Sequence, residues 1–338
     1  MNNKIIVSGM RSTGKLHLGH YFGVIKNWVE LQKEFNCYYF VADWHALTTK
    51  FNQTENLRQN VLDVTMDWLA SGIDPDKSTI YVQSHVPQIA QLHILLSMIT
   101  PQNWVERDPT LKDMAKILRM QKEEGKSETS SASYGLIGYP VLMTSDIMMF
   151  NANYVPVGID QVAHIEISRD IIRRFNNIYN TDYFVEPEPK LTQVPLLKGL
   201  DGNKMGKSFN NDIKISDDEE TTTKKIMTGI TDRTRLRKTD LGHPDNCEVI
   251  FDYWKIFGND TEIEEIESMC KKGEIGCADC KRKLAQKVNE YFAPIREKRK
   301  KYEENPKLVE EILIEGSKKA QLRAQEVLDK AKEAIKMF

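Results

Sequence analysis

The sequence has no apolar run long enough to span a lipid bilayer, and its first residues lead into a strand pattern without the apolar segment of a secretory leader. It also has no excess of either charge, because 47 lysines and arginines nearly balance 49 aspartates and glutamates and leave a net charge of −2. A membrane protein and a general nucleic-acid-binding protein, which would need a strong basic excess, are therefore disfavoured. With 338 residues, 40% of them hydrophobic and 28% charged, the chain is typical of a two-domain globular protein that we expect in the cytoplasm.

Local basic clusters would have to hold any RNA, because the overall charge is balanced. Such clusters occur at residues 233–238, 281–283 and 296–301. A solvated helix face explains each of these clusters when it is taken singly.

Short apolar runs alternate with helical patterns through the first part of the chain. Strands are predicted at residues 4–8, 37–42, 79–83 and 154–157, and helices at 21–35, 54–71 and 160–176. Continuous apolar strands suit a parallel sheet that is buried on both faces. Past residue 216 the strand patterns stop and helical patterns follow. The sequence thus predicts an α/β fold: a Rossmann-like, doubly wound parallel sheet domain in residues 1–215 that carries the active site, and an all-helical C-terminal domain in residues 216–338.

A turn rich in glycine and histidine follows the first predicted strand and opens a helix, with the sequence Thr13-Gly14-Lys15-Leu16-His17-Leu18-Gly19-His20. Glycine lets the backbone approach a ligand closely, the new helix directs free N–H groups at an anion, and neutral imidazoles donate to phosphate oxygens. We therefore predict a nucleotide site. Its residues are Arg11, Ser12 and Thr13 beneath the nucleotide, and His17, Gly19 and His20 at the phosphates. A nucleotidyltransferase of coenzyme biosynthesis would explain this turn, but not the motif described next.

The second motif lies far downstream and reads Lys204-Met205-Gly206-Lys207-Ser208. Two lysines on a mobile, glycine-flanked loop suit the binding of a leaving polyphosphate. Together the two motifs resemble the signatures of class I aminoacyl-tRNA synthetases, which read H-x-G-H and K-M-S-K-S. The resemblance implies that all five residues of the second motif bind ATP, which such enzymes use together with Mg²⁺. It also implies catalytic roles for the two histidines and both lysines. Gly206 departs from the usual serine, which removes a hydroxyl group and loosens the loop.

Residues 110–133 interrupt the pattern with lysine, glutamate, serine and threonine and few apolar side chains. We expect a mobile insertion over the active site, although a frayed surface helix fits the composition equally well. The family resemblance implies that one lysine of this segment reaches ATP. The candidates, among which the sequence does not choose, are Lys112, Lys116, Lys122 and Lys126.

The segment from Tyr139 to Ile147 holds the candidates for amino-acid selection. On a helix, Met143 and Asp146 would share one face. A buried carboxylate would accept the single N–H of an indole and would reject analogues that lack this donor. The pattern alone favours a structural explanation, in which Asp146 caps a helix or faces solvent and Met143 packs in the core.

A longer resemblance favours selection by Asp146. Tyr139-Pro140-x-Leu142-Met143-x-x-Asp146, followed by Val155-Pro156-Val157-Gly158-x-Asp160-Gln161-x-x-His164, is similar to tryptophanyl-tRNA synthetases, and the similarity covers essentially the whole chain. It implies a tryptophan site at Tyr139, Met143, Asp146 and Gln161, and adenylate contacts at Gly158, Ile159 and Asp160. Tyrosyl-tRNA synthetase is the alternative within the same class.

Four of the five cysteines crowd into the last third of the chain: Cys247, Cys270, Cys277 and Cys280. In a cytosolic protein disulfides are disfavoured, and four thiolates can hold either a structural zinc ion or an iron–sulfur cluster. The spacing C-x22-C-x6-C-x2-C resembles that of some bacterial tryptophanyl-tRNA synthetases, which implies a 4Fe–4S cluster near the anticodon.

The sequence therefore predicts an enzyme that forms tryptophanyl-adenylate from L-tryptophan and ATP and charges tRNA(Trp). The family resemblance also implies a homodimer. A synthetase-like paralogue that binds RNA through its metal domain and catalyses nothing is the alternative from another class.

Overall fold

The computed structural model describes residues 4–108, 111, 132–191 and 197–338. Its centre is one sheet of five parallel strands in the order β3-β2-β1-β4-β5. The strands are β1 (Ile5–Arg11), β2 (Asn36–Ala42), β3 (Ser78–Val82), β4 (Tyr154–Val157) and β5 (Glu188–Leu191). The order reverses between β1 and β4, so the predicted doubly wound sheet is confirmed, and its switch point lies at their carboxyl ends.

The two faces of the sheet bury alternate side chains of the same strands. In β2, Cys37, Tyr39 and Val41 belong to one hydrophobic core, whereas Tyr38 and Phe40 belong to the other. This burial on both faces explains why β1, β2 and β3 read as continuous apolar runs. The sequence analysis missed β5, which is a polar, proline-containing edge strand.

Helices cover both faces of the sheet and extend beyond it. Those of the first two hundred residues are α1 (Leu18–His20), η1 (Tyr21–Ile25, a π-helix), α2 (Lys26–Leu31), α3 (Asp43–Lys50), α4 (Leu57–Ala70), α5 (Pro87–Ile99), α6 (Gln102–Val105), α8 (Tyr134–Ile137), α9 (Tyr139–Met148) and α10 (Val162–Tyr179). Short 3₁₀ turns are η2 (Gln83–His85), η3 (Ile159–Gln161), η4 (Lys207–Phe209) and η5 (Pro244–Asn246).

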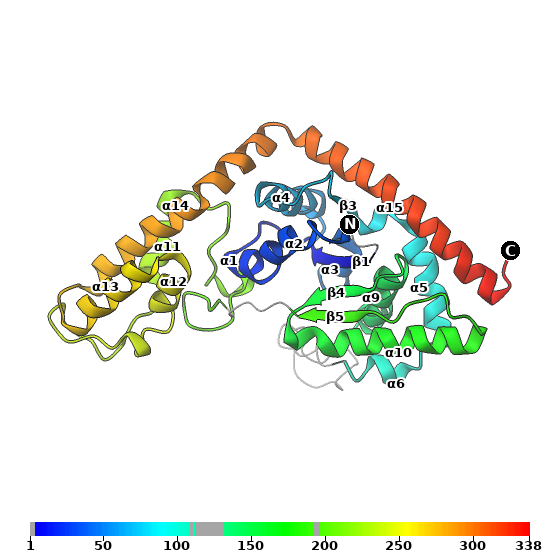
Figure 1. The fold of residues 1–338 in the computed structure, drawn as a ribbon, viewed down its shortest axis with the longest axis horizontal. Helices are drawn as coiled ribbons and strands as arrows, with labels where there is room; N and C mark the ends of the chain where they lie inside the picture. Colours follow the sequence, from blue (N-terminus) through cyan, green and yellow to red (C-terminus); the bar gives the residue numbers. More distant parts are fainter. Residues whose placement is uncertain (1–3, 109–110, 112–131, 192–196) are drawn as a thin grey trace.

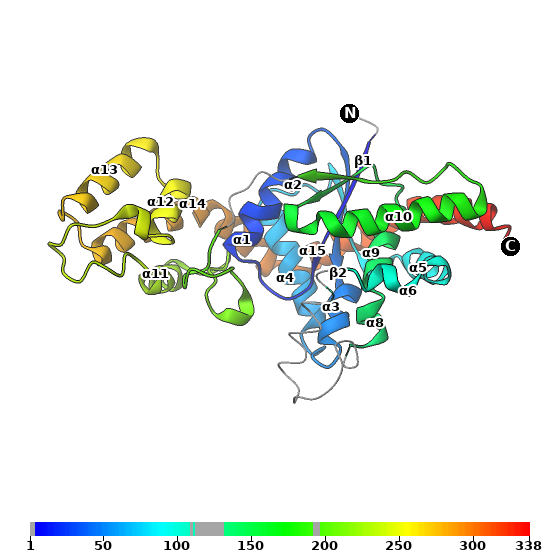
Figure 2. The ribbon, with the colours of Figure 1, turned by 90° about the horizontal axis from the view of Figure 1, so that it is seen from below.

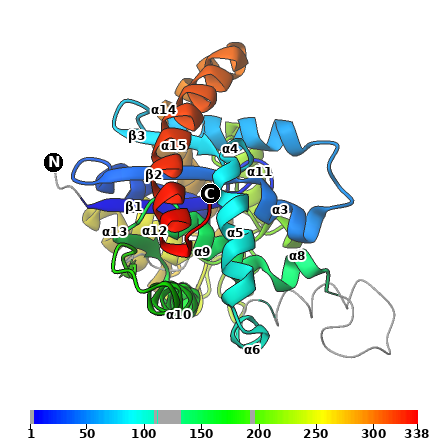
Figure 3. The same cartoon turned by 90° about the vertical axis from the view of Figure 1, so that its right-hand side faces the viewer.

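Past β5, the described chain contains helices and loops but no further strand, in agreement with the predicted helical region. The helices are α11 (Glu219–Thr228), α12 (Ile250–Phe257), α13 (Asp260–Lys271), α14 (Cys277–Glu304) and α15 (Pro306–Ile335). Figures 1 and 2 show α11, α12 and α13 at one end of the molecule, away from the sheet. The long helix α14 leads back toward α4, and α15 then runs beside α5 over the β3 edge (Figure 3).

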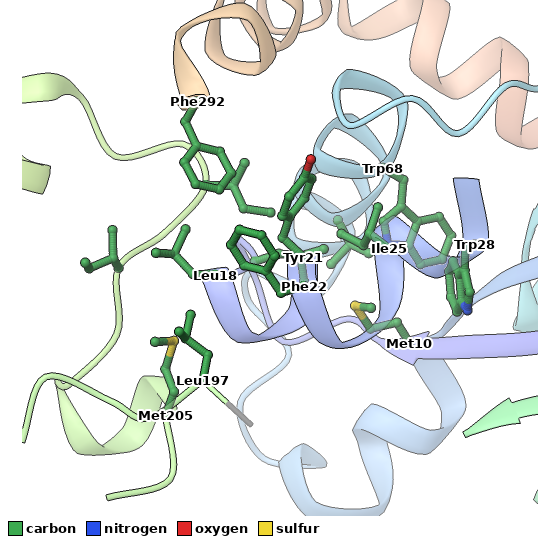
Figure 4. Packing of buried hydrophobic residues seen from close by; sticks show 14 of the residues in the cluster. Met10, Leu18, Tyr21, Phe22, Ile25, Trp28, Trp68, Leu197, Met205 and Phe292 are labelled. Carbon is green, nitrogen blue, oxygen red and sulfur yellow. The ribbon is translucent and has the colours of Figure 1, made fainter. Parts of the chain in front are cut away.

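The core on one face of the sheet continues into the helical region. Phe292 of α14 packs edge-on against Tyr21 of η1 at a ring distance of 5.2 Å. Figure 4 shows this contact beside Leu18, with Met205 and Leu197 approaching Leu18 from the downstream loop. One continuous apolar core therefore joins the first motif, the second motif and α14.

Among the described helices, none has the length and apolarity needed to cross a lipid bilayer.

Candidate active site

A cavity of about 350 Å³ opens at the switch point of the sheet. It lies at the carboxyl ends of β1 and β4, where ligands bind in open α/β sheets. Its lining includes seven residues that the sequence analysis singled out: Arg11, His20, Tyr139, Met143, Asp146, Gly158 and Gln161. The structure therefore brings residues from three distant segments to one cavity.

The first motif forms a tight turn between β1 and α1. Gly14 has φ +92°, which a side chain would strain, and a Cβ on Gly19 would lie 3.0 Å from the His17 ring. The rings of His17 and His20 stack with centroids 3.7 Å apart. His20 Nδ1 accepts the backbone N–H of His17 at 3.3 Å, so the ring proton of His20 stands on Nε2.

Both histidine rings are electrically neutral at physiological pH. Burial lowers the pKa of His17 to about 4, although Asp212 acts against this shift. Burial also holds the pKa of His20 well below its usual value, and His17 and Lys207 lower it further. Neutral imidazoles can donate hydrogen bonds to phosphate oxygens without adding a fixed charge.

The residues before this turn are held by the neighbouring helix α3. Arg11 Nη2 donates to the Ala46 carbonyl at 3.4 Å and to the Thr49 hydroxyl. Burial lowers the pKa of Arg11, but a guanidinium remains charged at neutral pH. Within the described structure, Ser12 Oγ and His17 Nδ1 are buried without a hydrogen-bond partner. Such buried polar atoms fit a ligand that offers hydrogen bonds at this turn.

The second motif contacts the first directly, across almost two hundred positions of sequence. Lys207 Nζ donates to the carbonyls of Gly14 at 2.6 Å and Thr13 at 3.1 Å. Burial lowers the pKa of Lys207 to about 8, against the attraction of nearby carboxylates, of which Asp67 acts most strongly. Its ammonium therefore stays positive at neutral pH, in contact with the predicted phosphate site.

In the rest of the second motif, one side chain is buried in the core and another is exposed to solvent. Met205 is buried in the core, Lys204 is exposed, and Gly206 N donates to Asn211 Oδ1 at 2.9 Å. The backbone of Gly206 is extended, with φ −167°, so the position does not require glycine. A Cβ there would lie 3.0 Å from the ring of Phe209, which is exposed.

Asp146 lies on α9 at the cavity wall, with its carboxylate 1% exposed. It accepts hydrogen bonds from His45 Nε2 at 2.9 Å and from Gln83 Nε2 at 2.8 and 2.9 Å. Burial raises the pKa of Asp146, while these two hydrogen bonds act against the rise. The carboxylate retains lone pairs that can accept a further donor. Gln83 escaped the sequence analysis, although its place directly after β3 was a usable signal.

Tyr139 begins α9 and belongs to a buried polar group beside the cavity. Its hydroxyl lies 3.2 Å from Asp108 Oδ2 and 3.2 Å from His164 Nδ1, and the last two atoms are 2.6 Å apart. Asp108 and His164 were not singled out as site residues, because their roles depend on contacts between distant segments.

One further predicted residue lies on the surface beside the cavity. Ile159 is 83% exposed on η3, next to Gly158 and Gln161 of the cavity. Nothing is described for the side chains of Asp160 and Ser208. The insertion candidates Lys112, Lys116, Lys122 and Lys126 lie outside the described residues.

The four predicted metal ligands gather in the helical region. Cys247 follows η5, Cys270 lies near the end of α13, and Cys277 and Cys280 lie in the first turn of α14. Burial raises the pKa of the Cys280 thiol to about 12, and the other three cysteines act in the same direction. The four sulfurs therefore lie within electrostatic reach of one another.

Hydrogen-bond donors surround these sulfurs. Burial raises the pKa of the Cys247 thiol, the backbone N–H groups of Phe251 and Asp232 act against this rise, and Arg235 Nη1 donates to Cys270 Sγ at 3.8 Å. Among the described residues, no three histidine, cysteine or acidic side chains are arranged to hold a metal ion as they stand. The cysteines are thus gathered, but they do not form a ready ion site.

Comparison with known proteins identifies relatives that match nearly the whole chain. The profile described as tRNA synthetases class I (W and Y) matches residues 2–293. The tryptophan–tRNA ligase of Thermotoga maritima is 43% identical over 339 residues, which cover 98% of this chain and 99% of the relative. That of Aquifex aeolicus is 40% identical, with 98% and 99% covered.

Solved structures agree with these sequence relatives. The tryptophanyl-tRNA synthetase of Campylobacter jejuni, complexed with ADP and tryptophan, is 37% identical with a TM-score of 0.87, covering 98% of this chain and 100% of that one. The tyrosyl-tRNA synthetase of Archaeoglobus fulgidus, complexed with L-tyrosine, is 20% identical with a TM-score of 0.65 over 88% of this chain and 91% of that one. The second similarity shows a shared fold only.

Proposed function

This chain belongs to the class I tRNA synthetases of the tryptophan and tyrosine family, and we propose that it activates L-tryptophan with ATP and charges tRNA(Trp). The observation that carries this proposal is the contact between the two motifs, in which Lys207 binds the carbonyls of Thr13 and Gly14 beside the switch-point cavity. Relatives named tryptophan–tRNA ligase that match over nearly their whole length support the same activity.

In the first step the carboxylate of tryptophan attacks the α-phosphate of ATP, which yields tryptophanyl-adenylate and pyrophosphate. The protein contributes positioning and charge neutralisation to phosphoryl chemistry of this kind. His17 and His20 donate to phosphate oxygens, while Lys207 stabilises the departing pyrophosphate together with Mg²⁺. Lys204, exposed on the same loop, approaches the phosphates from solvent.

We propose further ATP contacts from the other residues that the sequence predicted. They are Arg11, Ser12, Thr13, Gly19, Gly158, Ile159, Asp160, Met205, Gly206 and Ser208. Arg11 and Gly158 line the cavity itself, which supports contacts with the adenylate.

We assign the amino-acid pocket to tryptophan because its deepest polar group is a carboxylate. Asp146 accepts hydrogen bonds and, when ionised, donates none, which suits the indole N–H. His45 and Gln83 hold the carboxylate in place, and Met143 supplies an apolar wall. Tyr139 and Gln161 line the same cavity, which supports contacts with the bound amino acid.

The second step transfers the tryptophanyl group to the terminal ribose of tRNA(Trp). We propose that residues 1–215 form the catalytic domain and that residues 216–338 contain the anticodon-binding region. The basic side chains of the loop before η5 support tRNA contact, since Arg233 and Arg237 are exposed there. Charging takes place where translation occurs, so we propose a cytoplasmic location.

We further propose a 4Fe–4S cluster held by Cys247, Cys270, Cys277 and Cys280, with a structural Zn²⁺ as the alternative. An all-thiolate donor set fits such a cluster. The N–H groups at Cys247 and the guanidinium at Cys270 would stabilise its negative charge.

We propose a homodimer as well, formed through the face of α5. This helix is largely apolar, and Ile94 and Met98 remain 53% and 75% exposed. Tyr134 of α8, at 78% exposure, presents a further aromatic ring. Light scattering of the unmodified protein should give the mass of a dimer. Met98→Glu should give the mass of a monomer, whereas the control Leu322→Glu, at an exposed position of α15, should keep the mass of a dimer. Equal masses for all three proteins at the monomer value would refute the dimer.

The function is tested by ATP–pyrophosphate exchange followed by tRNA charging with the purified chain. We expect exchange that depends on tryptophan and charging of tRNA(Trp), and loss of both in Lys207→Met. A folded protein that binds tRNA(Trp) but catalyses no exchange would be a non-catalytic paralogue instead. Exchange driven by tyrosine would assign the chain to the other branch of the family.

A further inference from the structure

Arg299 is the one large cation on the far half of α14 that the structure buries, with a side chain only 2% exposed. The sequence placed it in the basic cluster 296–301, a candidate RNA-binding patch, and burial removes it from that surface. A buried guanidinium is costly unless its donors are satisfied. The burial of Arg299 therefore indicates a role in the interior of the protein.

Its partners are carboxylates of α4. Arg299 Nε donates to Asp67 Oδ1 at 2.6 Å, and Nη2 donates to Asp63 Oδ1 at 2.8 Å. Asp63 and Asp67 share one face of α4 because they are four residues apart. Nη1 binds Glu303 on the next turn of α14. The guanidinium thus fixes α14 against α4 through the two carboxylates of Asp63 and Asp67.

The contact continues from α4 into the nucleotide-binding turn. The second oxygen of Asp67, Oδ2, accepts the backbone N–H of Leu16 at 2.7 Å. Leu16 directly precedes His17, and its own carbonyl accepts the N–H of Ile215 at 2.9 Å. Asp67 is fully buried, so this single carboxylate joins Arg299 to the first motif without competition from water.

The same carboxylate acts on the second motif. Lys207 Nζ donates to the carbonyls of Thr13 and Gly14, which lie three and two positions before Leu16. Asp67 is also the carboxylate that most favours the charged form of Lys207. If Asp67 moved, it would therefore disturb both the turn and the ammonium of Lys207 that the turn binds.

We propose that Arg299 is a positioning residue for adenylation, which holds the Leu16–His20 turn in its ATP-binding geometry through Asp67. Without the guanidinium, Asp67 is left as an uncompensated buried carboxylate. It then gains a proton or turns away, and in either case its hydrogen bond to the Leu16 N–H weakens. Arg299 acts on a turn more than 280 positions earlier in the chain, through packing of α14 on α4 (Figure 1).

This inference rests on the proposed function for its kinetic readout, but it has a second readout that needs no substrate. Amide hydrogen exchange of the segment containing Leu16 reports whether its N–H is held. Arg299→Met should speed that exchange and lower kcat/KM for ATP in pyrophosphate exchange by about 10- to 100-fold. Tryptophan binding, which depends on the other end of the cavity, should stay within about twofold, an allowance near the size of ordinary surface effects.

Two further variants separate positioning from mere folding. Adding Asp67→Asn to Arg299→Met supplies a neutral amide oxygen that can accept the Leu16 N–H. This double variant should regain slow amide exchange and most of the lost kcat/KM. Arg299→Lys keeps the charge but not the fork of donors, so it should fall between wild type and Arg299→Met. If Arg299→Met does not fold, these two variants decide the matter.

Arg58→Met is the matched control. Arg58 also joins α4 to a C-terminal helix, through Glu310 of α15 at 2.8 Å, but it is 83% exposed. It should leave amide exchange at Leu16 and kcat/KM unchanged. The proposal is overturned if Arg299→Met keeps both at wild-type values, or if the double variant gains nothing over Arg299→Met. A wild-type chain without tryptophan-dependent exchange would refute the proposed function, and Leu16 protection would still decide this inference.

Discussion

Lys207 is the residue at which the two motifs meet. Its ammonium is partly buried, hydrogen-bonded to two carbonyls of the turn and close to two stacked, neutral histidines. Lys207 therefore places a titratable positive charge beside neutral hydrogen-bond donors. This arrangement suits a reaction in which negative charge develops on departing pyrophosphate.

The pH dependence of adenylation should follow Lys207. Burial lowers its pKa to about 8, so the charged form is present below pH 8 and is lost as pH rises through that value. In the free enzyme, kcat/KM for ATP should therefore fall above about pH 8. Lys207→Arg, which stays protonated, should remove this fall even if its maximal rate is lower. A flat profile up to pH 10 in the wild type would speak against the role of Lys207.

Asp146 should control amino-acid affinity and leave ATP affinity alone. Asp146→Ala removes an acceptor held by His45 and Gln83, a loss of about 1.5–3 kcal/mol. The KM for tryptophan should rise roughly ten- to a hundredfold while the KM for ATP stays near its original value. Steady-state exchange kinetics measure both, with Asp170→Ala on the exposed face of α10 as the control. An unchanged preference for tryptophan would rule out Asp146 as the selector.

At the scale of elements, the local patterns were predictable and the pairings were not. The apolar runs of β1, β2 and β3 follow from burial on both faces, and the turn after β1 follows from its glycines. The edge strand β5 has no such run, because polar residues and a proline suffice at an edge. The hydrogen bonds of Asp146 with His45 and Gln83 join three segments of the chain. The periodicity of a single segment gives no information about such contacts between segments.

The loop that carries the second motif should tolerate serine at Gly206. Its backbone there is extended, and among the described side chains the only close neighbour of an added Cβ is the exposed ring of Phe209, which can move. Gly206→Ser should shift stability by no more than about 0.5 kcal/mol and leave tryptophan-dependent exchange near wild type. Thermal unfolding and exchange kinetics test this. A tenfold loss of exchange would show that the loop needs the absence of a side chain there.

At the scale of the whole molecule, α14 joins the cysteine group to the catalytic half. Cys277 and Cys280 begin the helix, Phe292 packs on Tyr21, and Arg299 reaches Asp67. The sequence predicted helices in this region and a metal site at the four cysteines. It did not predict the contacts of α14 with the active-site half, because a buried Arg299 is not expected within a local basic cluster. The predicted division at residue 215 stays a prediction.

Loss of one clustered cysteine should separate the two steps of the reaction. Cys280→Ser should lose iron and sulfide from anaerobic preparations, keep most tryptophan-dependent exchange and impair tRNA charging, because anticodon bases need a rigid platform. Cys37→Ala, in the buried strand β2, should keep its iron. A single zinc and no iron in the wild type would contradict the cluster. Equal loss of exchange and charging would instead make the cysteine group a support for the whole fold.

The central claim is that the two motifs form one ATP site whose neighbouring pocket takes tryptophan. A rapid-quench, single-turnover measurement of adenylate formation, with tryptophan and with tyrosine at equal concentrations, tests it most directly. The account predicts a rapid burst of tryptophanyl-adenylate and a much lower rate with tyrosine, because we propose a pocket shaped for an indole whose N–H reaches Asp146. Comparable bursts with both amino acids, or no burst with tryptophan, would contradict it.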